Sequence, residues 1–164
     1  MAGSYSVTGA GLTLANQAVT LIFVNPIAAP NRDLSFRRFW VGQSNTASYT
    51  GNQIVQLNTQ VTAFPTLVSA TPNKLYNSDS ASIITGATTG AAGKSGINAS
   101  AEGAGAKTVI WPDAFSPANG WLLVLVPDED IKMGSGSLNG LGVHFPVAAT
   151  TLTNWSFGCT WLEK

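Results

Sequence analysis

Hydrophobic and polar residues alternate with a period of two along most of this chain, and they rarely follow the 3.6-residue period of a helix. The alternating segments are rich in Val, Ile, Thr, Phe and Trp, with Gly, Pro, Asn and Asp between them. One helical alternative stays open, in which Ile54, Leu57 and Val61 form one or two turns before Pro65. The pattern otherwise predicts an all-β protein, with strands near residues 4–8, 17–24, 34–43, 53–59, 66–70, 81–85, 107–111, 121–126, 139–145 and 153–162.

The last predicted strand is the most aromatic one. Trp155, Phe157, Cys159 and Trp161 share one of its faces, and small residues occupy the other. Burial of the three rings would contribute about 5 to 9 kcal/mol, which is comparable to the net stability of a whole domain. We therefore expect this strand to close a hydrophobic core rather than to present a ligand platform.

Two further segments indicate how the strands are layered. The run WLLVLV at 121–126 is apolar on both faces and lies between Gly120 and Pro127, which predicts a strand buried between two layers. Asn139-Gly140 is a turn signal that precedes a cleanly alternating strand at 141–145. Together they predict a single-domain antiparallel β-sandwich that spans residues 1–164.

The segment 86–107 differs from the rest because Gly and Ala supply most of it. Ile97 is its only large apolar side chain. Ordering some twenty residues costs roughly 20 to 40 kcal/mol of backbone entropy, whereas one buried Ile returns only about 2 kcal/mol. The sequence therefore predicts a long Gly/Ala-rich loop that is either flexible or ordered by a partner subunit.

Charge is scarce in this chain of 164 residues. Asp, Glu, Lys and Arg make up 10% of it and cancel to a net charge of zero, against about 25% in an ordinary soluble domain. A neutral surface does not attract nucleic acid or anionic membranes. It also leaves molecules without mutual repulsion, so we expect either a subunit whose surface is covered in an assembly or a protein that works outside a crowded cytosol.

Cysteine content and the N-terminal region restrict the protein class further. Cys159 is the single cysteine, so we expect neither an internal disulfide nor a cysteine-rich zinc site. The most apolar run, at 18–24, is too short to span a bilayer, and the opening residues lack the basic region of a secretory signal. These features predict a soluble chain without a visible export signal and without a membrane partner.

Two patterns suggest catalysis or cofactor binding only superficially. Gly93-Lys94-Ser95 resembles the end of a phosphate-binding loop, but position 88 holds Thr where that motif needs Gly, and no helix is predicted after the lysine. His144 is the only histidine, so a metal site with two or three His ligands is not expected. It should point away from Val143 and Phe145, as a structural or surface residue. We predict no catalytic, cofactor-binding or metal-binding residue.

Charged residues cluster at two places. Asp128, Glu129 and Asp130 lack the spacing of a calcium loop and are interpreted as a solvated strand end. A second group surrounds the 34–43 strand and consists of Arg32, Asp33, Arg37 and Arg38. Alternation would place Leu34, Phe36, Arg38 and Trp40 on one face. Whether such an arginine stacks on a ring or reaches a partner's carboxylate stays open.

Exposed aromatic side chains are a feature of sugar-binding sandwiches. Four of the five tryptophans lie in or beside strongly apolar strands, and Trp111, before Pro112, is the one expected to be exposed; the five are Trp40, Trp111, Trp121, Trp155 and Trp161. Carbohydrate binding is therefore the alternative function, with Trp111 as its candidate residue.

The two ends of the chain resemble a known family. From Lys107 onward the order is TVIW, PANGW, PDEDIKM, GLGVHFP, AATTLTNW and a final strand that closes on an aromatic residue and Glu; the start reads MAGSYSVTG and ANQAVTLIFVN. This order is similar to small virion proteins encoded in the structural gene clusters of tailed bacteriophages. The FRRFW segment and the Gly/Ala loop depart from that family.

The resemblance implies a jelly-roll β-sandwich on the phage head, as a decoration or minor capsid protein. It also implies a homotrimer whose partners are itself and the major capsid protein, made in the host cytoplasm and located on the virion surface. We therefore expect a non-enzymatic structural protein without cofactor, metal or nucleic acid.

Overall fold

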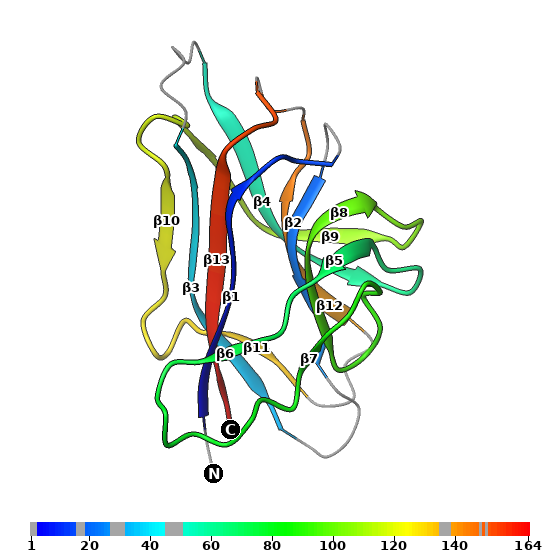
Figure 1. Ribbon diagram of the computed structural model, residues 1–164, viewed down its shortest axis with the longest axis vertical. Helices are drawn as coiled ribbons and strands as arrows, with labels where there is room; N and C mark the ends of the chain where they lie inside the picture. Colours follow the sequence, from blue (N-terminus) through cyan, green and yellow to red (C-terminus); the bar gives the residue numbers. More distant parts are fainter. Residues whose placement is uncertain are drawn as a thin grey trace.

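The computed structural model describes residues 3–15, 19–26, 32–44, 51–134, 139–147, 149 and 151–164. Over these residues all of the regular secondary structure is β-strand, and the strands form two sheets packed face to face as a β-sandwich (Figure 1). The predicted all-β sandwich is thus confirmed. The first residues of the predicted 17–24 strand lie outside the described residues.

One sheet, which we call sheet A, contains the first and last strands side by side. All its pairs are antiparallel. Its order is β10 (Trp121–Val124), β3 (Leu34–Gln43), β13 (Trp155–Glu163), β1 (Gly3–Leu12) and β6 (Asn73–Lys74), and β11 (Ile131–Met133) also pairs with β3.

The second sheet, sheet B, contains the remaining strands. Its one parallel pair joins β7 (Thr85–Gly86) to β8. Its order is β5 (Thr66–Ser69), β8 (Lys94–Ala101), β2 (Val19–Val24), β12 (Asn139–Phe145), β4 (Gln53–Val61) and β9 (Lys107–Phe115). The helical alternative at 54–61 is therefore wrong, and of the predicted 81–85 strand only Thr85 lies in a strand.

The closing strand β13 packs its aromatic face into the core, as predicted. Trp155, Phe157 and Trp161 are fully buried, and the indole of Trp155 meets the ring of Phe145 edge-on at 5.0 Å. Cys159 lies on the same face, where burial raises the pKa of its thiol to about 12. β13 pairs with both β1 and β3, so it lies in the middle of sheet A.

The prediction for residues 121–126 is wrong in one respect. The segment forms β10 at the edge of sheet A, with Trp121 and Leu125 buried. Leu122 and Val124 point outward, and 65% of the Leu122 surface is exposed. The outer side of sheet A carries no third layer in the described structure, so a strand that is apolar on both faces is covered on one face only.

The prediction for 86–107 is wrong as well, because Lys94–Ala101 forms the strand β8 inside sheet B. β8 pairs with β2 on one side and with β5 and β7 on the other, and residues 95–99 are buried. Burial of Ile97 is not the only interaction that orders this segment. The backbone hydrogen bonds that β8 makes on both sides, and the close approach that Gly and Ala permit, supply the missing stabilisation.

The predicted common face of Leu34, Phe36, Arg38 and Trp40 is interrupted by a β-bulge. Thr160 pairs with Arg38 and Trp161 pairs with Phe36, so Arg37 is the additional residue in β3. Beyond the bulge the alternation reverses, and Phe39 and Val41 enter the core. Arg38 and Trp40 therefore lie on the outer face of sheet A.

Candidate functional site

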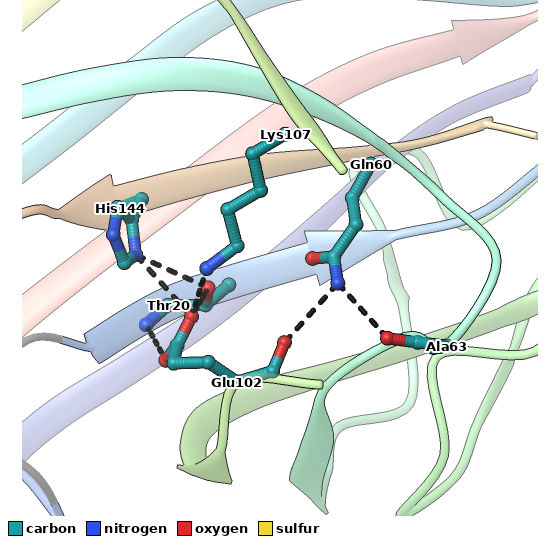
Figure 2. Close-up of polar contacts among 6 residues, drawn as sticks. All are labelled: Thr20, Gln60, Ala63, Glu102, Lys107 and His144. Atoms are coloured by element: carbon teal, nitrogen blue, oxygen red, sulfur yellow. Dashed lines mark hydrogen bonds and ion pairs between the residues drawn. The ribbon is translucent and has the colours of Figure 1, made fainter. Parts of the chain in front are cut away.

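Ionisable side chains converge at one place in sheet B, just beyond the end of β8. We call it the Glu102 cluster; its members are Thr20, Gln60, Glu102, Lys107 and His144, which come from β2, β4, the turn after β8, β9 and β12 (Figure 2). The segment 102–106 between β8 and β9 thus brings the carboxylate over the strands that carry its partners.

The Glu102 carboxylate accepts several hydrogen bonds. The Thr20 backbone N–H donates to Oε1 and the Thr20 hydroxyl donates to Oε2, both at 2.6 Å. The Lys107 ammonium donates to Oε2 as well. Burial by itself would raise the pKa of Glu102, but the hydrogen bonds from Lys107 and Thr20 outweigh it and hold that pKa below its ordinary value. Glu102 is therefore ionised at neutral pH.

His144 contacts the same carboxylate from the other side. Its Nδ1 lies 3.4 Å from Glu102 Oε2 and 3.3 Å from Thr20 Oγ1. Because the Thr20 hydroxyl already donates its hydrogen to Glu102, we assign the imidazole proton to Nδ1, which then faces two acceptors. Burial, followed by the charge of Lys107, lowers the pKa of His144 to about 4, although Glu102 opposes this. The contact is therefore not a salt bridge at neutral pH.

The backbone around Glu102 is fixed by an amide side chain. Gln60 Nε2 donates to the Glu102 carbonyl oxygen at 3.1 Å and to the Ala63 carbonyl at 3.0 Å. Figure 2 shows these bonds beside the ionisable members of the cluster.

The cluster contains a hydroxyl, an imidazole, a carboxylate and an ammonium group, as many reactive sites do, but these groups are not arranged for catalysis. Its hydroxyl donates to a carboxylate rather than to the imidazole, so Thr20 is not activated as a nucleophile. The Lys107 ammonium already neutralises Glu102. The arrangement cross-links the turn after β8 to β2, β9 and β12, and this is the role that its geometry supports.

A fully buried carboxylate lies at the end of β13. Glu163 is fully buried and accepts from the Ser82 hydroxyl, from the Ile83 backbone N–H at 3.1 Å and from Trp161 Nε1 at 3.3 Å. Arg32 Nη1 lies 3.8 Å from it. Arg32 is therefore engaged within the chain.

Other predicted sites take structural roles. Lys94 begins a strand, not a helix, and its Nζ donates to the Thr85 hydroxyl at 2.8 Å, so the phosphate-loop pattern has no counterpart here. Asp128 and Glu129 are exposed as predicted. Asp130 is not solvated, because it is buried and accepts from Arg37 Nε at 3.2 Å.

The outer face of sheet A holds the second candidate site, which we call the sheet A groove. It consists of three adjoining hollows of about 320, 380 and 270 Å³ that follow β3 from Arg37 to Gly42. Neighbouring hollows share residues, and together they are lined chiefly by Arg38, Trp40, Leu75, Leu122, Val124 and Thr160.

The five tryptophans divide between core and surface. Trp121 is nearly buried, and its Nε1 donates to Asp113 Oδ2 at 2.9 Å. Trp40 lies over Gly158, where any β-carbon would come within 2.0 Å of the indole. Trp111 on β9 is 42% exposed, which confirms the prediction of an exposed tryptophan.

Sequence reasoning missed two groups of residues. Glu102 and Lys107 flank the end of a segment that was interpreted as a loop, and their distance from the single histidine along the chain gave no signal. Alternation predicts that Arg38 and Trp40 share a face with Leu34 and Phe36, whereas the bulge at Arg37 puts them on the opposite, outer face. The alternation of Phe39 and Val41 was the signal that could have shown the correct face.

Among the residues described, no group of three or more His, Cys, Asp or Glu side chains is arranged to hold a metal ion. The same part of the chain contains no helix long and apolar enough to cross a membrane. No protein-family model, no curated protein and no solved structure matches the chain.

Proposed function

We propose that this protein is a non-enzymatic virion structural protein, a head decoration or minor capsid protein of a tailed bacteriophage. It stabilises the particle through contacts with the major capsid protein and with its own copies in a homotrimer. It is made in the host cytoplasm and works on the head surface. The observation that carries the proposal is the order of the strands, which adds to the resemblance in sequence.

The strand order supports a jelly roll. Four antiparallel pairs are nested along the chain: β1 pairs with β13, β2 with β12, β3 with β10 and β4 with β9. Successive pairs alternate between sheet A and sheet B. A ribbon of nested antiparallel pairs that is wound across two sheets corresponds to a jelly roll, an architecture that viral capsid and lectin domains use. The link between this strand order and a capsid role is an analogy of fold alone.

The use of charge supports a structural role. Glu102, Asp130 and Glu163 are each held by a cation of the same chain. Such internal pairs fix the connections between strands, and they leave few charges for a substrate or for nucleic acid. A neutral exterior with apolar residues at the surface suits a subunit that is largely covered in an assembly.

The proposal is tested with the purified chain and with undecorated heads of the phage whose structural genes lie beside its gene. We expect sedimentation at the mass of a trimer and saturable binding to the heads. A terminase or major capsid gene next to its own gene would be the expected neighbourhood. A strict monomer that does not bind heads would overturn the proposal.

Carbohydrate binding is the second candidate, and the exposed indole of Trp111 favours it. A glycan array tests it directly. Saturable binding that Trp111→Ala abolishes, without a change in the unfolding midpoint, would select this function over the first. If the Trp111→Ala variant loses binding only because it no longer folds, the result would count against this function.

A further inference from the structure

The sheet A groove has two apolar ridges. Leu122 and Val124 project from the edge strand β10 on one side, and both are more than half exposed. Leu75 and Tyr76, which follow β6, form the other side, and a hydrogen bond of 2.8 Å from the Leu75 backbone N–H to the Ser4 carbonyl holds this ridge on β1. Two exposed apolar ridges on one face of a neutral domain indicate an interaction surface.

The floor between the ridges is built from two rows of side chains. Cross-strand pairing places Val124, Arg38, Thr160 and Ser6 in one row, across β10, β3, β13 and β1. In the next row Leu122 lies beside Trp40, and Trp40 covers Gly158. The small residues of β13 and β1 keep the floor low, so the groove runs along the strand direction.

Arg38 is the charged residue at the centre of this floor. Within the described residues its guanidinium has no ion pair, whereas Arg32 and Arg37 pair with Glu163 and Asp130. Arg38 is exposed between Val124 and Trp40, so a carboxylate that reaches its guanidinium can form a bidentate pair while the neighbouring apolar side chains contact the rest of the ligand. The groove is therefore apolar along its sides and complementary to one negative charge in its middle.

We propose that the sheet A groove binds an extended segment of a protein partner that carries an aspartate or glutamate between apolar residues. The length fits, because the six residues from Arg37 to Gly42 measure about 20 Å, which is the length of a six-residue extended peptide. This inference rests on the proposed function, in which the partner is the capsid protein, and it names the surface that the partner occupies.

The chemistry of the ridges favours a peptide over a sugar. Leu75, Leu122 and Val124 offer aliphatic contacts that apolar side chains can fill, whereas a sugar site needs several amide or carboxylate groups to bond its hydroxyls. In the central hollow the polar side-chain groups are the Arg38 guanidinium, the Trp40 indole N–H and the hydroxyls of Ser6 and Thr160, with no amide or carboxylate among them. Asn119, the amide of the groove lining, lies in the hollow at the Gly42 end.

Peptide selection on the purified full-length chain tests this inference without any capsid. A library of random twelve-residue peptides is panned on the immobilised protein, and the enriched peptides are synthesised and titrated by fluorescence anisotropy. We expect them to carry an acidic residue flanked by apolar residues. Replacing that acidic residue by its amide should weaken binding at least tenfold, as should Arg38→Gln or Leu122→Ser, because each removes a contact at the centre of the groove.

Lys132→Gln is the matched control, since Lys132 is an exposed cation on β11 outside the groove lining, and it should bind as the original chain does. Thermal unfolding of each variant verifies that the fold is retained. Enrichment of no peptide, of peptides without an acidic residue, or of peptides indifferent to Arg38→Gln would overturn the inference.

Two further results would overturn it in favour of another occupant. One is glycan binding that Trp40→Ala abolishes, and the other is self-association that Leu122→Ser abolishes. If Arg38→Gln binds phage heads as well as the original chain does, the proposed function stands and the groove is not its interface.

Discussion

Strands β8 and β10 differ in opposite ways from the burial that the hydrophobicity of their residues predicts. β8 is built from small and polar residues around a single Ile97, yet it lies inside sheet B and is buried over most of its length. β10 consists of apolar residues only, yet it forms an edge of sheet A and exposes Leu122 and Val124. Burial in this protein therefore follows the position of a strand in its sheet more closely than the hydrophobicity of its residues.

The small residues of β8 are what allow it to be buried. A β-carbon on Gly96 would come within 2.6 Å of Leu67 Cβ and within 2.9 Å of two backbone oxygens, so β5 and the segment before β8 lie directly against this glycine. Asn98, at φ 51°, turns its amide toward the connection between β1 and β2. Backbone hydrogen bonds and a few specific side-chain hydrogen bonds stabilise β8, whereas apolar side chains stabilise the other buried strands.

The outward residues of β10 show the reverse case. Leu122 and Val124 contribute little to the core, and their exposure lowers solubility. An apolar surface of this kind suits the proposed partner-binding groove, and Arg38 beside it has no ion pair among the residues that the structure describes. β8 therefore contributes to the stability of the sandwich, whereas the outer face of β10 is exposed and belongs to the surface proposed to bind a partner.

Asn98→Leu should give the largest loss, because it removes the polar bonds that anchor β8. The Asn98 amide accepts from the Ala15 N–H and donates to the Thr13 carbonyl, both at 2.9 Å. Leucine leaves both groups without this partner and is strained at a positive φ, so we expect a loss of about 3 kcal/mol in urea unfolding. Asn73→Leu, at an exposed position on β6, is the control and should change stability by less than about 0.5 kcal/mol. Equal losses of stability in the two variants would show that the Asn98 hydrogen bonds do not anchor β8.

Acid should destabilise the end of β8 through His144. The folded-state pKa of about 4 lies below the ordinary value of 6.5, so the unfolded chain takes up the proton first, and stability is lost as the pH falls from about 6.5 toward 4. We expect a loss of about 2 kcal/mol between pH 7 and pH 5, measured by urea unfolding. Glu102, whose pKa is also lowered, adds to the loss only in stronger acid.

His144→Gln is the control for this pH dependence, because it keeps a polar side chain at the position without a group that titrates in this range. Its stability should change much less between pH 7 and pH 5. An unchanged slope in this variant would show that another group is responsible.

Gly96→Ala should cost about 1 to 2 kcal/mol, since the added methyl group has to displace backbone atoms of neighbouring segments. Gly42→Ala on β3 is a matched control, because a β-carbon there meets no atom within 4 Å. We expect the two variants to separate clearly in their urea midpoints at equal m-values. Coincident midpoints would show that β8 is not closely packed.

Much of the fold could be predicted from the sequence because alternation is a local property. The aromatic face of β13 and the exposure of Trp111 follow from neighbouring residues alone. The burial of β8 could not be predicted, because it depends on β2 and β5, which are distant along the chain. The outward face of β3 was missed because a single additional residue, Arg37, reverses the alternation.

The Glu102 cluster could not be predicted for a related reason. Its members are separated by up to 124 residues between Thr20 and His144, and they meet only because β2 and β12 are neighbours in sheet B. Each member has an ordinary local context in the sequence. The Asp130 pair with Arg37 likewise depends on the bulge that brings the arginine out of register.

The smallest stability effect should come from Leu122→Ser, although it removes a large apolar side chain from a strand that consists of apolar residues only. Leu122 is mostly exposed, so we expect a change within about 0.5 kcal/mol. Ile97→Ser in β8 is the matched comparison and should cost about 3 kcal/mol, because Ile97 is buried between β2 and β5. Urea unfolding of the two variants side by side decides the point. If Leu122→Ser were the more costly change, β10 would be part of the core after all, and its outer face would not be available to a partner.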